Sequence, residues 1–128
     1  PQLGKASAVC VVAKEMGNSL AYEYVAKYGT PITTATEKAK QLLRQKGFVR
    51  RKLMDLHVQA ATAIPHGALI IIRTSYTTVT GRDRTSYGCG FSSISYEDAE
   101  KRALSNLRSY SWGWNENHGY EVVTKSAF

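Results

Sequence analysis

Residues 68–91 read ALIIIRTSYTTVTGRDRTSYGCGF, and this stretch decides the fold. It opens with a continuous apolar run, Ala68–Ile72, and ends in a second β-rich run, Thr85–Phe91. The sequence Gly-Arg-Asp at 81–83 separates the runs and is typical of a tight turn. The whole stretch therefore predicts a β-hairpin.

A matching hairpin stands near the start of the chain. Residues 8–12 (AVCVV) form an apolar run and residues 20–28 (LAYEYVAKY) a second β-rich run. Gly-Asn at 17–18 gives the turn signal between them. The two hairpins begin about 60 positions apart, so we expect an internal repeat.

Each hairpin leads into a stretch with helical periodicity. Thr34 precedes Glu37 by three residues, and Ser95 precedes Asp98 by three, which in both cases is the pattern of a capping box. Apolar residues then recur at helical spacing, and the first helix is expected to stop at Gly47. The predicted buried stripes are made mostly of alanine, which allows a helix to pack closely on a sheet: Ala35, Ala39, Leu42 and Leu43 in the first helix, and Ala99, Ala103 and Leu107 in the second.

A strand is expected after each helix, at 54–64 and at 119–125. We therefore predict an α+β fold made of two pseudo-symmetric ββαβ halves, about 7–64 and 67–128. These halves would form an antiparallel sheet with two helices packed on one face. The 128 residues fit a single domain, 1–128.

The net charge of +7 is concentrated in one segment. The sequence from Lys38 to Lys52 holds seven cations and no acid, whereas the other ten cations balance the ten acids of the chain. Such a segment sets up a local field that attracts anions. Its members are Lys38, Lys40, Arg44, Lys46, Arg50, Arg51 and Lys52.

Part of this segment has an ordinary explanation. Arg44 and Lys46 fall near the end of the first helix, where cations favour the helix dipole. Arg50, Arg51 and Lys52 repel one another unless something anionic relieves them, although a solvated surface also explains many such runs. We take Lys38, Arg44, Lys46 and the three consecutive cations as candidate ligand-binding residues.

Aromatic residues provide a second candidate surface. Trp112 and Trp114 flank Gly113 and are followed by Asn, Glu, Asn and His, a set that can stack on bases or sugars and hydrogen-bond to them. The alternative is that the indoles fill the base of the core. Several tyrosines add to this: Tyr22, Tyr24 and Tyr28 share one strand face, with Tyr76 and Tyr87 expected on neighbouring strands.

Evidence for catalysis is weak, and we lean toward a protein that is not an enzyme. Asp55 and His57 point to one face of a strand, and with His118 they would support at most a small hydrolase or isomerase. Pro1 is not followed by the immediate strand of enzymes that use an N-terminal proline as a base. No phosphate loop, metal-ligand spacing or cofactor motif is found, so we expect no catalytic residues, metal or cofactor.

Cys10 and Cys89 each lie within a predicted strand. The simplest interpretation treats them as two small buried side chains, and a single disulfide that joins the halves is the main alternative. No apolar run is long enough to cross a membrane, and the chain as given starts with no signal peptide. We expect a soluble protein and leave its location open.

Two family resemblances can be drawn from short segments. Residues 24–29 (YVAKYG), with the apolar stripe of the first helix and Gly47-Phe48, are similar to one half of a SPOR-type glycan-binding domain, and residues 91–123 echo them. The extra hairpin strands are foreign to that family. Residues 56–107 resemble the later part of a double-stranded-RNA-binding domain, but the second helix begins YEDAE where that family carries lysines.

The function that we expect is a non-enzymatic binding module for an anionic polymer, with nucleic acid ahead of an acidic glycan. Trp112 or Trp114 would stack on the ligand, while the basic segment would contact its phosphates or carboxylates. The alternative is a protein–protein or self-assembly module that uses tyrosine-rich strands and forms a homo-oligomer.

Overall fold

The computed structural model describes residues 5–15, 18–48, 54–64, 66–77, 80–110, 114 and 118–128. These residues form an α+β fold whose strands pair antiparallel, which confirms the predicted class. The elements in chain order are β1 (Lys5–Glu15), β2 (Asn18–Pro31), α1 (Ile32–Gln45), β3 (Met54–Thr62), β4 (Ala68–Thr77), β5 (Asp83–Ser92), α2 (Tyr96–Tyr110) and β6 (Glu121–Ala127).

The strands divide into two three-stranded sheets. The first sheet has the order β2-β1-β3, and the second has the order β5-β4-β6. Each sheet therefore has the first strand of its ββαβ segment at its centre. Both hairpins predicted from the sequence are present, as β1 with β2 and β4 with β5.

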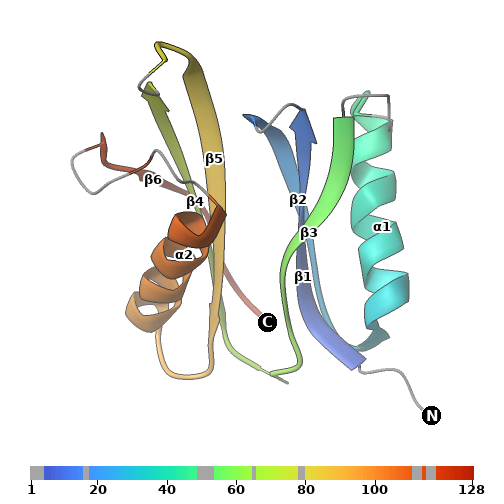
Figure 1. Cartoon of the computed structure of the whole chain (residues 1–128). Helices are drawn as coiled ribbons and strands as arrows, with labels where there is room; N and C mark the ends of the chain where they lie inside the picture. Colours follow the sequence, from blue (N-terminus) through green and yellow to red (C-terminus); the bar gives the residue numbers. More distant parts are fainter. Residues whose placement is uncertain are drawn as a thin grey trace.

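The two sheets lie between the two helices, so α1 and α2 are on opposite sides of the molecule (Figure 1). One apolar cluster joins α1 to the first sheet and another joins α2 to the second. A third cluster fills the space between the sheets. The predicted arrangement, one sheet with both helices on one face, is therefore wrong, because there are two sheets and each helix covers its own.

The central strands explain this layering, because both of their faces are apolar. On β1, Val9 and Val11 pack in the cluster with α1, whereas Cys10 and Val12 pack between the sheets. On β4, alternate residues of the run at 68–72 are divided in the same way. A strand that is apolar on both faces must be covered on both faces, so each sheet needs a helix on one side and the other sheet on the opposite side.

α2 packs unusually close to β5, at two glycines. A Cβ at Gly88 would lie 2.9 Å from the Cβ of Leu107 and would also overlap the carbonyl oxygen of Ala103. A Cβ at Gly90 would overlap the carbonyl oxygen of Ala99. The alanine stripe of α2 therefore rests directly on the backbone of β5, as its small side chains allow.

The two helices begin differently. Ser95 caps α2, since its Oγ accepts a hydrogen bond from the backbone N–H of Asp98 at 3.1 Å. The carboxylate of Asp98 does not complete a capping box but accepts from the hydroxyl of Ser92 at 2.6 Å. α1 begins at Ile32, directly after Pro31, with no side-chain cap, so the capping box predicted at Thr34 is wrong.

The end of α1 is as predicted. Gly47 has a positive φ of 98°. Its N–H donates to the carbonyl of Arg44, and the N–H of Phe48 donates to the carbonyl of Leu43, both at 3.0 Å. This is the Schellman arrangement that glycine favours.

Candidate functional site

The helical part of the basic segment lies on α1. Because Ala35, Ala39 and Leu43 face the first sheet, the side chains of Lys38 and Arg44 are on the exposed side of the helix. Arg50, Arg51 and Lys52, together with Trp112, lie outside the described residues. Of the predicted site, the structure therefore describes Lys38, Arg44, Lys46 and Trp114.

A shallow groove follows the exposed side of α1. It is lined by Thr33, Thr34, Gln41 and the two cations Lys38 and Arg44, with Glu37 as its one acid. Arg44 Nη1 lies 3.6 Å from a carboxylate oxygen of Glu37, and both side chains are well exposed. We call these six residues the α1 groove.

Lys46, the third described cation of the predicted site, has a different environment. Its ammonium group pairs with the carboxylate of Glu23 on β2, which is only 18% exposed. This ion pair connects the C-terminal end of α1 to the edge strand β2 and so helps to hold the helix on its sheet. Lys46 therefore has a structural role that is not seen for Lys38 or Arg44.

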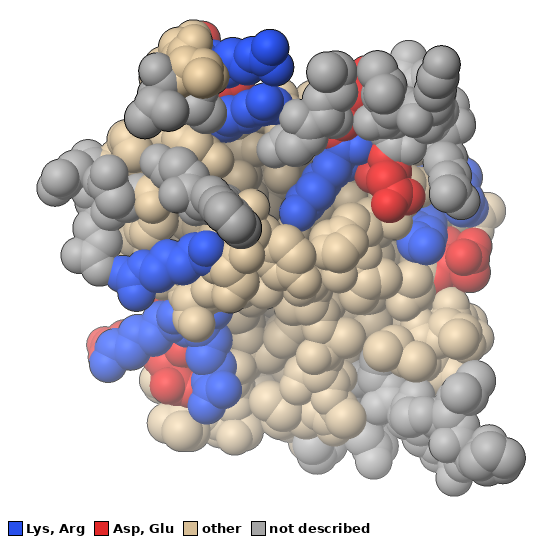
Figure 2. Space-filling model, viewed as in Figure 1, with Lys and Arg blue, Asp and Glu red and all other residues tan. Residues whose placement is uncertain are grey.

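Positive charge on the surface extends beyond this segment. Figure 2 shows Lys and Arg side chains over the helix at the left, α2, and along the upper part of the molecule, around a broad uncharged centre. α2 and the neighbouring strands contribute Lys101, Arg102, Arg108 and Lys125 to the cations of the chain. On α2 these cations are balanced by Glu97, Asp98 and Glu100, and Arg102 is paired with Asp98.

Trp114 is part of the core. Its side chain is 7% exposed and packs in the cluster between α2 and the second sheet. The indole N–H lies 2.9 Å from the hydroxyl of Thr74 and 3.1 Å from the carbonyl of Gly119. The guanidinium carbon of Arg108 lies 5.8 Å from the ring centroid. For Trp114, this burial and hydrogen bonding agree with the alternative in which the indole fills the core and does not bind a ligand.

Four of the five tyrosines of the predicted surface pack inward, and the side chain of Tyr28 lies outside the described residues. Tyr22, Tyr24 and Tyr87 belong to the cluster between the sheets, and the rings of Tyr22 and Tyr87 are 5.0 Å apart. Burial raises the pKa of the Tyr87 hydroxyl, partly offset by Arg73. The Tyr76 ring packs near the cluster under α2 and lies 5.5 Å from the ring of His118.

His57 belongs to a polar cluster that the sequence alone did not reveal. Its ring lies 5.2 Å from the ring of Tyr110 at the end of α2. The Nζ of Lys14 lies 4.4 Å from the centroid of the Tyr110 ring. Asp55 of β3 lies opposite Lys14 of β1 in the strand register. The Nε2 of His57 is buried with no hydrogen-bond partner among the described residues.

This environment lowers the pKa of His57. Desolvation by burial is the main cause, and the charge of Lys14 adds to it, while Asp55 opposes it. Burial likewise lowers the pKa of Lys14. The hypothesis of catalysis required His57 and His118 to share a cleft, but the ring contacts that the structure describes for them are with different tyrosines, Tyr110 and Tyr76.

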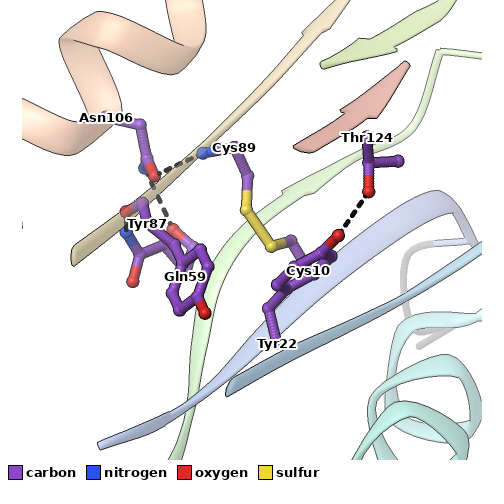
Figure 3. The surroundings of a disulfide bond; sticks show 7 residues. All are labelled: Cys10, Tyr22, Gln59, Tyr87, Cys89, Asn106 and Thr124. Carbon is purple, nitrogen blue, oxygen red and sulfur yellow. Dashed lines mark hydrogen bonds between the residues drawn. A yellow bond between two sulfur atoms is a disulfide. The ribbon is translucent and has the colours of Figure 1, made fainter. Parts of the chain in front are cut away.

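A disulfide joins the two sheets. Cys10 on β1 and Cys89 on β5 are bonded, with their Cα atoms 6.5 Å apart (Figure 3). The interpretation as two separate buried cysteines is therefore wrong, and the bridge between the halves is correct. Both side chains belong to the cluster between the sheets, which places the sulfur atoms next to each other.

Two amide side chains surround this bridge. Asn106 of α2 accepts a hydrogen bond from the N–H of Cys89 at 3.0 Å and donates to the carbonyl of Gln59 at 3.2 Å (Figure 3). The buried side chain of Gln59 donates to the carbonyl of Tyr87. These amides tie β3 to β5, and nothing in their sequence spacing pointed to that role.

Within the described ranges, no group of three or more His, Cys, Asp or Glu side chains is placed to hold a metal ion. None of the described helices has the length and apolar character needed to cross a membrane. No protein-family model matches the sequence, and no curated protein or solved structure is significantly similar to it.

Proposed function

We propose that the protein is a non-enzymatic module that binds an anionic polymer, with nucleic acid ahead of an acidic glycan. The binding surface comprises the α1 groove and the three consecutive cations that follow α1 in sequence, Arg50, Arg51 and Lys52. The observation that supports this best is the groove itself, in which two cations alternate with hydroxyl and amide side chains. That combination provides both charge and directional hydrogen bonds to phosphate or carboxylate oxygens.

The pairing of Arg44 with Glu37 does not prevent this. Exposed ion pairs of this kind contribute about 0–1 kcal/mol. A guanidinium can therefore leave Glu37 for a phosphate, to which it offers two parallel hydrogen bonds. Lys46 contributes less to binding, because moving it would leave the half-buried carboxylate of Glu23 without its ion pair.

Arg50, Arg51 and Lys52 supply most of the electrostatic attraction in this proposal. They follow α1 in sequence after residues 46–49 and add three positive charges to those of Lys38 and Arg44. Since Trp114 is buried, stacking on a base or sugar falls to Trp112.

We also infer that the two ββαβ segments are an internal repeat related by a pseudo-twofold axis. Their identical element order and the identical strand order of their sheets support this. In such an arrangement the basic segment would belong to one half alone. The polymer site would then be a specialisation of the first half within a single domain, 1–128.

The proposal is tested by binding titrations over a range of salt, with single-stranded DNA, duplex DNA and a polyuronate as probes. We expect Arg50→Ala/Arg51→Ala/Lys52→Ala to lower affinity and to reduce the slope of log K against log salt by about 2 to 3. Lys38→Ala/Arg44→Ala should weaken binding to a smaller extent.

The matched control is Lys27→Ala/Lys101→Ala/Lys125→Ala, which removes three exposed cations from β2, α2 and β6. It should retain affinity at moderate salt. Equal losses in the control and in the first triple variant would show that binding follows net charge alone. Absence of salt-dependent binding by the unmodified protein would refute the proposal.

A further inference from the structure

The Cys10–Cys89 disulfide is enclosed by the core. The two residues are 0% and 2% exposed, and both pack in the cluster between the sheets. Aromatic side chains from both sheets share this cluster, among them Tyr22, Tyr87 and Phe91. Thiol–disulfide exchange requires an attacking sulfur to reach one of the bonded sulfurs. In the folded protein the surrounding side chains block that approach.

Polar contacts hold the sheets together on either side of the bond. Asn106 accepts from the N–H of Cys89 and donates to the carbonyl of Gln59, which connects β5 to β3 through α2 (Figure 3). The hydroxyl of Tyr22 on β2 lies 2.6 Å from that of Thr124 on β6. Exchange at the disulfide therefore requires these contacts to break and the two sheets to separate.

This burial distinguishes a structural disulfide from a redox sensor. Redox-sensing cysteines are accessible to solvent, so that oxidants and reductants reach the thiolate. Cys10 and Cys89 have no such access in the folded state. Their bond also connects positions that are 79 residues apart, one in each sheet. It is a permanent link between the two halves of the molecule.

The same burial determines when the bond forms. In the oxidation, the two cysteine thiols give up two protons and two electrons, the S–S bond forms, and an external disulfide is reduced to two thiols. A chain that folded in the reduced state would bury both thiols beyond the reach of that oxidant. The oxidant must therefore be present while the sheets are still apart. In the cytosol, glutathione and thioredoxin keep the thiols of a new chain reduced.

We propose that the chain matures in an oxidising compartment outside the cytosol, where exchange with a disulfide oxidant forms the Cys10–Cys89 bond before the two sheets close. The inference does not rest on the polymer-binding proposal, because it uses no residue of the basic segment. It adds a reaction partner of defined chemistry, an external disulfide, which acts on the unfolded chain.

The location is tested in cells that naturally produce the protein. Free thiols are blocked with N-ethylmaleimide, and the cells are then fractionated. The chain is unfolded, reduced and labelled with a polyethylene glycol maleimide, which adds mass at each cysteine that was in a disulfide. We expect two labels, on a chain recovered outside the cytosolic fraction. A chain recovered in the cytosolic fraction, or one without labels, would overturn the proposal.

The order of events is tested by refolding the reduced chain from urea. Oxidised glutathione is present from the start or is added after circular dichroism shows that folding is complete. We expect Cys10 and Cys89 to be oxidised about tenfold or more slowly in the second case, since exchange then waits for the sheets to open. Equal rates in a folded reduced chain would contradict the proposed order. A reduced chain that stays unfolded supports that order, because the bond then has to precede folding.

The control for access is Cys10→Ala/Cys89→Ala/Ser105→Cys, whose one thiol is on an exposed position of α2. It should react with oxidised glutathione equally fast before and after folding. A thiol at this position that is slowed as much as the native pair would show that burial between the sheets is not the cause.

Discussion

α1 and α2 carry the same kind of apolar stripe but rest on different supports. Ala35, Ala39 and Leu43 pack against valine and alanine side chains of β1. The stripe of α2 lies against the backbone of Gly88 and Gly90 on β5. The comparison teaches that an alanine stripe fixes which face of a helix is buried, whereas the opposing strand decides how close the helix comes.

The largest expected effect comes from breaking the bond between the halves. Cys10→Ala/Cys89→Ala removes a crosslink between residues separated by 79 positions in sequence, and we expect a loss of about 4 kcal/mol in unfolding free energy. Denaturant unfolding with and without reductant measures this. Reductant should destabilise the unmodified protein and leave the double variant unchanged. The prediction would be contradicted if reductant left the unfolding free energy of the unmodified protein unchanged.

The next effect tests the close packing of α2. Gly90→Ala places a methyl group against the carbonyl of Ala99, so α2 must move away, at a cost of about 3 kcal/mol. Gly47→Ala is the matched change beside α1, where no atom lies within 4 Å of the added carbon. It should cost only about 1 kcal/mol, for its positive φ. Equal losses in urea unfolding would refute the difference between the two helices.

The helix starts should differ by a smaller amount. Ser95→Ala removes the hydroxyl that accepts from the N–H of Asp98, which should cost about 1 kcal/mol. Thr34→Ala changes a side chain inside α1 that caps nothing, so it should change stability by no more than a few tenths of a kcal/mol. Thermal unfolding of both variants tests this, and a larger loss for Thr34→Ala would be contrary to it.

The smallest effect concerns pH. The pKa of His57 is below 6.5 in the folded state, so between that lowered value and 6.5 the unfolded chain binds more protons. The unfolding free energy should therefore fall as pH drops through this window, and His57→Gln should remove part of the fall. The exposed His66 provides the control, His66→Gln. Identical pH profiles for His57→Gln and the unmodified protein would exclude the effect.

Much of the secondary structure followed from local patterns. The apolar runs at 8–12 and 68–72 became central strands, and both alanine stripes are buried as predicted, except that Leu42 is only half-buried. The start of α1 was misplaced, because the capping pattern at Thr34 is present in sequence but β2 runs directly into the helix at Pro31. A local pattern cannot show where a preceding strand ends.

The candidate site was less predictable. Lys38 and Arg44 line one exposed groove on α1, a feature that the sequence pattern had not indicated. Trp114 is a buried ring bonded to Thr74, although its sequence context equally allowed a binding surface. The pairing of Lys46 with Glu23 depends on where α1 ends relative to β2, which is a relation between elements rather than within one.

The sequence by itself determined which segments are strands and helices, which of their faces are apolar, and where positive charge is concentrated. These properties depend on neighbouring residues and on backbone periodicity. Only the tertiary structure decided that there are two sheets, that the helices lie on opposite sides, that Cys10 bonds to Cys89, and that Lys14, His57 and Tyr110 meet. Those features join residues far apart in sequence, and they arise because two-sided apolar strands can be buried only when the two sheets pack together.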